Sequence, residues 1–366
     1  MAPTIVDVHT HMYPPSYLKL LSSRTETPYV HNPSNNAPPR LIILPSDNDV
    51  SIPLAERGRP IDDSYSSLTS KLAFMKAHSI STSVISLANP WLDFLPKETA
   101  AATARTVNDE MEALCAREPV GKLYFLGTLP LSASVEDILD EISRLAKLPH
   151  LRGLILGTTG LGSGLDDAAL DPLWNAIEKE KLLVFIHPHY GLPSEVFGPR
   201  QHESGHVMPL SLGFPLETTI AFTRMYLAGV FEGFPALKIL LAHAGGAIPF
   251  LSGRIESCVL HERRFVGEGN SSRRDIWDVL KRNVWLDGVI YSSVGLKAAV
   301  EVVGKERVLF GTDHPFFPPL EGDDGEGEWL SVSLNVEAVR KAFGGDERSA
   351  SGVLGLNAIQ LLGLGA

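Results

Sequence analysis

The sequence predicts an α/β protein in which eight parallel strands, alternating with helices, form a (β/α)8 barrel. Eight short apolar runs, rich in β-branched residues, recur along the 366-residue chain, as strands buried on both faces do. Segments with helical periodicity fill most of the intervals, and this alternation favours a TIM-type barrel in a single domain, residues 1–366. A doubly wound sheet is the alternative, but the first run lacks the glycine-rich phosphate turn that often follows the first strand of that fold.

The expected strands, in chain order, are Ile5–His11, Ser83–Leu87, Leu123–Thr128, Gly153–Leu156, Leu183–His187, Ile239–His243, Val284–Asp287 and Val308–Thr312. Helical periodicity is clearest in Ser64–His78, Thr99–Arg117, Val135–Leu148 and Asp171–Lys181.

Two long irregular stretches are expected as inserted loops after strands one and five, Arg24–Asp62 and Tyr190–Glu217. The first is rich in Pro, Asn and Ser, and it follows strand one on the side where barrel enzymes place their active sites. Residues 24–62 therefore form either a lid over the site or a disordered surface loop.

Composition excludes several classes of partner. The net charge of −11 argues against nucleic acid, and no apolar run is long enough to cross a membrane. The N-terminus lacks the pattern of a signal peptide, and the only cysteines, Cys115 and Cys258, are expected to be small buried hydrophobes. We therefore expect a protein of the reducing cytoplasm that acts on a small molecule.

Ligand-type side chains gather at the predicted strand ends. His9 and His11 share one face of strand one, because residues two apart in a strand point the same way. His187, His243 and Asp313 end strands five, six and eight, at the face where barrel active sites are built. Imidazole and carboxylate donors suit zinc, with manganese or iron as alternatives. His189 is an alternative to His187, although Pro188 argues against a continuing strand.

This pattern resembles the amidohydrolase superfamily. The runs Leu241–Gly246 and Gly311–Phe316 resemble its metal-dependent decarboxylase branch, which includes aminocarboxymuconate semialdehyde decarboxylase and γ-resorcylate decarboxylase. Four segments resemble the 5-carboxyuracil (isoorotate) decarboxylases of fungi, which serve pyrimidine salvage: residues 9–17, 85–91, 187–193 and 313–319. Binuclear members bridge two metals with a carboxylated lysine on strand four, and the run Arg152–Thr158 contains no lysine, so one metal is expected.

The resemblance implies a metal site and a reaction. One zinc ion, or manganese, would be bound by His9, His11, His187 and Asp313, and 5-carboxyuracil would lose carbon dioxide after protonation at C5. That protonation makes the carboxylate β to the C4 carbonyl, so that cleavage places electrons on the C4 oxygen. Asp313 would deliver the proton, although a carboxylate near zinc is a reluctant acid, and His243 could share or relay it.

The resemblance also implies substrate contacts. Arg59 would pair with the carboxylate, Asn89 would hydrogen-bond the ring edge, and Phe316 would stack on the ring. Arg254 would reach the neighbouring subunit's site in a homodimer or homotetramer, whereas its charge alone equally fits a salt bridge with Glu256 or Glu262. The substrate is expected to be a carboxylated pyrimidine or an aromatic acid. Hydroxybenzoate decarboxylation, amide or lactone hydrolysis, and a catalytically silent binding barrel are the alternatives.

Overall fold

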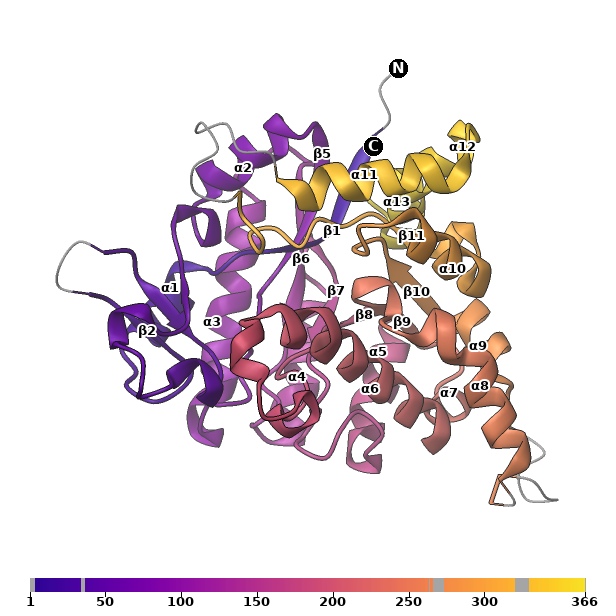
Figure 1. Ribbon diagram of the computed structural model, residues 1–366, viewed down its shortest axis with the longest axis horizontal. Coiled ribbons are helices and arrows are strands. Elements are labelled where there is room, and N and C mark those ends of the chain that lie inside the picture. Colours follow the sequence, from indigo (N-terminus) through magenta and orange to yellow (C-terminus); the bar gives the residue numbers. More distant parts are fainter. Residues whose placement is uncertain (1–3, 34–36, 263, 266–272, 320–328, 366) are drawn as a thin grey trace.

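The computed structural model describes residues 4–33, 37–262, 264–265, 273–319 and 329–365, and it confirms the predicted barrel. Eight strands form one sheet in which all neighbours are parallel and follow chain order (Figure 1). They are β1 (Ile5–His11), β5 (Ile80–Ser86), β6 (Leu123–Thr128), β7 (Leu151–Leu156), β8 (Leu183–Ile186), β9 (Lys238–Leu241), β10 (Val284–Asp287) and β11 (Val308–Leu309).

The barrel closes where the chain after β11 runs beside β1. The backbone N–H of Val8 donates to the carbonyl of Phe310 at 3.0 Å, and that of Asp313 donates to the carbonyl of His9 at 2.7 Å. An isolated parallel bridge also joins Thr10 to His314. This closure excludes the doubly wound alternative, and it brings the last strand's polar end next to the first strand's histidines.

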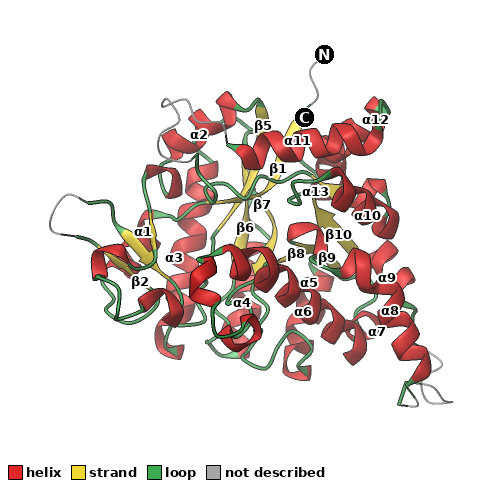
Figure 2. Ribbon diagram, in the orientation of Figure 1, coloured by secondary structure: helices red, strands yellow, loops and turns green. Residues whose placement is uncertain are grey.

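Helices cover the outside of the barrel (Figure 2). The four predicted helices are present with slightly shifted ends, and two of them begin at serine caps, since Ser67 accepts from the N–H of Ser70 and Ser134 from that of Asp137. The helices are α1 (Pro15–Ser22), α2 (Leu68–Ala77), α3 (Lys97–Cys115), α4 (Val135–Leu145), α5 (Asp171–Lys179), α6 (Phe214–Ala228), α7 (Val230–Gly233), α8 (Ile248–His261), α9 (Ile276–Asn283), α10 (Ser293–Val303), α11 (Leu330–Phe343), α12 (Glu347–Ser351) and α13 (Asn357–Leu362).

A β-bulge in β1 decides which of its side chains enter the barrel. The register against β5 shifts between Asp7 and Thr10. Val8 belongs to the apolar cluster that fills the barrel, and His9 packs edge-on against Phe185 of the same cluster. Consecutive residues thus face inward at the bulge, whereas Asp7 and Thr10 face the layer between the barrel and the helices.

The stretch 24–62, expected as an inserted loop, is mostly irregular where the structure describes it, but it is not without regular structure. It contains a three-stranded antiparallel sheet of β2 (Tyr29–His31), β3 (Arg40–Ile42) and β4 (Arg59–Pro60), which lies beside the barrel near α1 (Figure 1). Strands of two or three residues are too short for a periodicity signal, and the surrounding Pro and Asn residues indicated a loop. Of these residues, 34–36 lie outside the described part.

Three further expectations concern loops, cysteines and membranes. The second irregular stretch holds short helical turns and enters α6 at Phe214. Cys115 is buried as expected, but Cys258 is exposed on α8, because the helix turns that position outward. Among the described residues, no helix has the length and apolar content that a membrane span needs.

Candidate metal centre and substrate pocket

Four buried side chains converge at the carboxyl end of the barrel. His9 and His11 come from the end of β1, His187 directly follows β8, and Asp313 lies beyond β11. Their potential ligand atoms all lie within 4.8 Å of one another. Each of the four residues is at most 5% exposed, so the cluster is removed from bulk water.

The three imidazoles are held with Nε2 pointing into the cluster. Their Nδ1 atoms donate to Oδ2 of Asp287 (His9, 2.6 Å), Oγ of Ser86 (His11, 3.0 Å) and the Pro188 carbonyl (His187, 2.8 Å). The buried Nε2 atoms of all three histidines have no hydrogen-bond partner. Three Nε2 atoms aimed at one point, with outer partners that fix each ring through Nδ1, fit a single metal ion.

Asp313 supplies the carboxylate from a left-handed backbone conformation, with φ of 57°. Its Oδ1 lies 3.3 Å from Nε2 of His9 and 3.4 Å from Nε2 of His11. Burial alone would raise the pKa of Asp313, but the charge of His9 and the close imidazoles of His11 and His243 hold it well below its usual value. The carboxylate is therefore ionised at neutral pH and suited to bind a cation.

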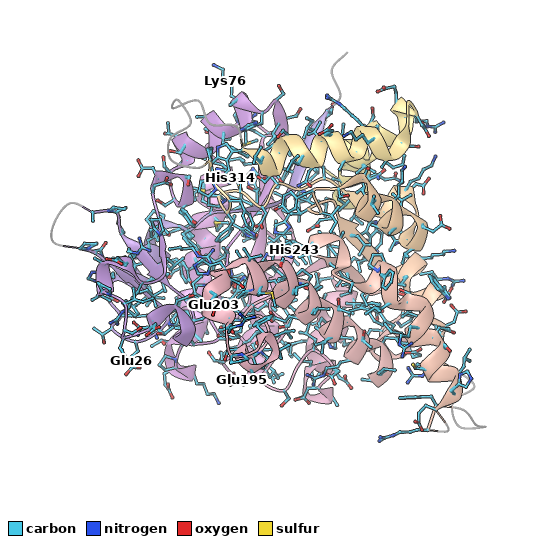
Figure 3. The ribbon with its side chains drawn as sticks, in the orientation of Figure 1. Glu26, Lys76, Glu195, Glu203, His243 and His314 are labelled. Carbon is cyan, nitrogen blue, oxygen red and sulfur yellow. The ribbon has the colours of Figure 1, made fainter. Side chains whose placement is uncertain are left out.

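His243 lies at the rim of this cluster rather than within it. Its Nε2 is 3.6 Å from Oδ2 of Asp313, and its backbone N–H donates to Asp287 at 3.1 Å. Figure 3 shows His243 inside the ring of helices, whereas Lys76 lies at the periphery. His243 begins the turn after β9 instead of ending the strand, so it can approach Asp313 without joining the four-residue cluster.

His189, the alternative to His187, lies outside the four-residue cluster. It is buried, with Nδ1 3.6 Å from Oδ2 of Asp93. The ring of Trp91 packs edge-on against both His187 and His189, at centroid distances of 5.6 and 4.7 Å. The structure thus brings His187 to the cluster, and it places His189 beside Trp91.

Two of the expected substrate residues lie together next to the cluster. Phe316 is buried, and its ring packs edge-on against His11 at 5.6 Å. The guanidinium of Arg59, on β4, lies 5.1 Å from the centroid of that ring. The small inserted sheet therefore presents a cation beside the ligand cluster.

Asn89 lies three residues past the end of β5 and is buried. Its side-chain Nδ2 donates to the His189 backbone carbonyl at 3.0 Å. The backbone carbonyl of Asn89 accepts a hydrogen bond from the Tyr13 hydroxyl at 2.7 Å. One amide hydrogen is thus occupied, which fixes the plane of the side chain.

Arg254 is exposed on α8 and lies apart from the cluster. It lines a groove of about 410 Å³ between α6 and α8, together with Leu251, Cys258 and Glu262. Within the described part of the chain, Arg254 forms no ion pair with Glu256 or Glu262. The salt bridge expected from its charge is therefore absent among the described residues.

Asp287, which was not predicted as a site residue, accepts from His9 and from the backbone N–H groups of His243 and Ala244. It ends the seventh predicted strand, so its position was a usable signal. Ser86 was also missed, because a serine at a strand end gives no distinctive pattern. Tyr65, packed edge-on against Phe316 at 5.7 Å, lies in the short helical turn Asp63–Tyr65, and the helical pattern predicted for Ser64–His78 carried no sign of a role at the site.

Comparison with known proteins agrees with this geometry. A family model described as amidohydrolase matches residues 6–364. The 2-amino-3-carboxymuconate-6-semialdehyde decarboxylase of Dictyostelium discoideum is 30% identical over 275 residues, covering 73% of this chain and 68% of that protein. The γ-resorcylate decarboxylase of Rhizobium radiobacter is 29% identical over 289 residues, covering 75% and 83%. The crystal structure of Metarhizium anisopliae IDCase in apo form is 51% identical, with a TM-score of 0.93, covering 99% of this chain and 97% of that one.

Proposed function

The chain belongs to the amidohydrolase family and is a metal-dependent decarboxylase, and we propose that it converts 5-carboxyuracil (isoorotate) to uracil and carbon dioxide. The observation that carries this substrate assignment is the 51% identity to IDCase (isoorotate decarboxylase) over nearly the whole chain. The cation of Arg59 beside Phe316 and the ligand cluster supports it, because a flat anionic ring needs both partners.

The proposed ligands are His9, His11, His187 and Asp313, holding one zinc or manganese ion. Such an ion supplies Lewis-acid chemistry at the substrate's C4 carbonyl oxygen, where negative charge develops. The donor set of three neutral imidazoles and one carboxylate suits either metal.

Substrate orientation falls to three side chains. Arg59 pairs with the carboxylate as a two-pronged donor, and Phe316 packs on the ring face. Asn89 offers its remaining amide hydrogen and its oxygen to the N–H and C=O edge of the pyrimidine. In this proposed binding mode, C5 of the substrate faces Asp313.

The reaction needs a proton at C5 before the carbon–carbon bond breaks. C5 then becomes tetrahedral, the bond to the carboxylate breaks, and its electron pair enters the ring and the C4 oxygen as carbon dioxide leaves. Asp313 is the proposed donor, and because its pKa is held low it must be protonated transiently. His243, with Nε2 3.6 Å from Asp313, is placed to share that proton.

A hydroxybenzoate such as γ-resorcylate is the second candidate substrate, favoured by the 29% identity to γ-resorcylate decarboxylase. Its carboxylate is also attached to a ring carbon that can be protonated first. The same residues would serve, since a phenol oxygen would occupy the place of the C4 carbonyl oxygen.

The test is a direct assay of purified protein with 5-carboxyuracil and, separately, 2,6-dihydroxybenzoate, identifying products by chromatography. Uracil from the first is the expected result, with little or no resorcinol from the second. Resorcinol without uracil would replace the proposed substrate with a hydroxybenzoate. Arg59→Met serves as a matched variant, in which KM should rise while metal content stays at the wild-type level.

A further inference from the structure

A fully buried lysine lies behind the ligand cluster, on the outer side of β1. Lys71 of α2 has no solvent-exposed surface. Its Nζ donates to Oγ1 of Thr10 at 2.7 Å and to Nδ1 of His314 at 2.6 Å. An ammonium group is costly to bury, so this one must be held by partners that its helix alone does not supply.

A buried carboxylate, Asp7, lies in the same layer without a direct ion pair to Lys71, because the bulge in β1 turns it outward. Asp7 is also fully buried. Its carboxylate accepts from Oγ1 of Thr312 at 2.7 Å, from the N–H of Thr312 at 3.1 Å and from the N–H of His9 at 3.3 Å. The charge of Asp7 acts on Lys71 across this layer.

The partners of these two charges alternate with the proposed metal ligands. Thr10 lies between His9 and His11, whereas Thr312 and His314 flank Asp313. Oγ1 of Thr10 also donates to the His314 carbonyl at 3.2 Å, which ties the two sides of the barrel closure directly.

Two aromatic rings pack against His314 and restrict the movement of its side chain. Its ring centroid lies 3.8 Å from that of Phe74 and 4.6 Å from that of Trp329. Figure 3 shows His314 among the side chains inside the ring of helices. A displacement of Lys71 would therefore be transmitted to the turn that carries Asp313, because the packed ring leaves His314 little room to compensate.

We propose that Lys71, hydrogen-bonded to Thr10 and His314, is a positioning residue that fixes the Asp313 turn against the His9–His11 strand and so sets the metal-binding geometry. This inference rests on the proposed metal site. The hydrogen bonds of Lys71 within the described chain go to Thr10 and His314 and not to a proposed ligand, so Lys71 would act through these two residues.

The experiment compares Lys71→Met, Thr10→Val and the control Asn108→Leu with the wild type. Asn108 is an equally buried bridge between a helix and a strand end, joining α3 to Thr128 of β6 through hydrogen bonds of 2.9 Å. For each protein, the Mn²⁺ dissociation constant is measured by chelator competition, the visible spectrum is recorded with Co²⁺ bound, and the Tm is measured.

Lys71→Met should weaken Mn²⁺ binding about 10–100-fold and shift the Co²⁺ spectrum, as loss of an outer partner of metal ligands does. Thr10→Val should also weaken Mn²⁺ binding and shift the Co²⁺ spectrum. The double variant Lys71→Met with Thr10→Val should lose less binding free energy than the sum of the two single losses, because both changes break one hydrogen bond. Asn108→Leu should lower the Tm without changing affinity or spectrum. If Lys71→Met does not fold, Thr10→Val decides alone.

Wild-type affinity and spectrum in every Lys71 and Thr10 variant that folds would refute the positioning role while leaving the metal site intact. An equal loss of affinity in Asn108→Leu would also refute it, because general destabilisation would then explain the effect. A wild-type protein that binds no Mn²⁺ would refute the metal site and this inference together.

Discussion

Nδ1 of His9 donates a 2.6 Å hydrogen bond to Oδ2 of Asp287, and neither side chain is exposed to solvent. This bond directs Nε2 of His9 into the ligand cluster, so that a residue outside the cluster governs one of its donors.

Asp287→Ala should weaken metal binding about 10–100-fold, because it frees the His9 ring and leaves its Nδ1–H buried without an acceptor. Chelator competition measures the affinity. Asp278→Asn is the control, since Asp278 pairs with Arg274 and Arg282 on the surface of α9. Unchanged affinity in Asp287→Ala would show that the bond does not support the metal site.

Asp313→Asn should reduce uracil formation at least about 100-fold, because the amide can neither accept nor return a proton. Product formation in single-turnover and steady-state assays measures this loss. The variant should be assayed at saturating metal, so that weaker metal binding is separated from lost proton transfer. Near wild-type turnover under that condition would transfer the role of proton donor to His243.

Metal binding should release one proton at neutral pH. Burial lowers the pKa of His9, but Asp287 and Asp313 overcome this and raise it to about 10 in the metal-free protein. Burial lowers the pKa of His11 to about 4 and that of His187 well below its usual value, so both are already neutral. Only His9 must therefore lose a proton to become a ligand.

The pKa of His9 also makes the stability of the metal-free protein and its metal affinity depend on pH in opposite directions. The folded-state pKa of His9 lies above its usual 6.5, so its contribution to the stability of the metal-free protein is full below about 6.5 and is lost as the pH rises through about 10. Metal affinity should rise roughly tenfold per pH unit between these values. Calorimetric titration in buffers of different ionisation enthalpy counts the protons, and a count of zero would contradict the assignment.

Arg254 should complete the site of a neighbouring subunit. The experiment dissociates inactive Arg254→Ala and Asp313→Asn dimers, mixes the chains and lets them re-form. About half of the new dimers should be mixed, each with one intact site of two, so about a quarter of wild-type activity should return. Sedimentation measures the oligomeric state. Full activity in Arg254→Ala alone, or a monomeric active enzyme, would rule out a shared site.

The sequence predicted the barrel and the convergence of its polar strand ends because both depend on short-range patterns. Apolar runs identified the strands, and the common direction of parallel strands placed His9, His187 and Asp313 at one end. The residues that orient these side chains were harder to find. Asp287 is an ordinary acidic residue in sequence, and its role depends on closing the barrel around it.

The bulge in β1 is a second feature that sequence patterns did not predict. Strict alternation along β1 would place Asp7 on the same face as His9 and His11, and only the extra residue in the register turns it outward beside Lys71. No periodicity in α2 distinguishes Lys71 from the exposed Lys76, and its burial follows from the barrel closure it supports.

The closure between β1 and the chain after β11 also has a consequence for synthesis. His9 and His11 emerge from the ribosome first, and Asp313 only after the last barrel strand, so a growing chain holds two donors long before it can hold the fourth. The complete donor set is therefore available only once the chain extends past Asp313 and the barrel has closed. Fragments that end before Asp313 should bind the metal more weakly than the whole chain.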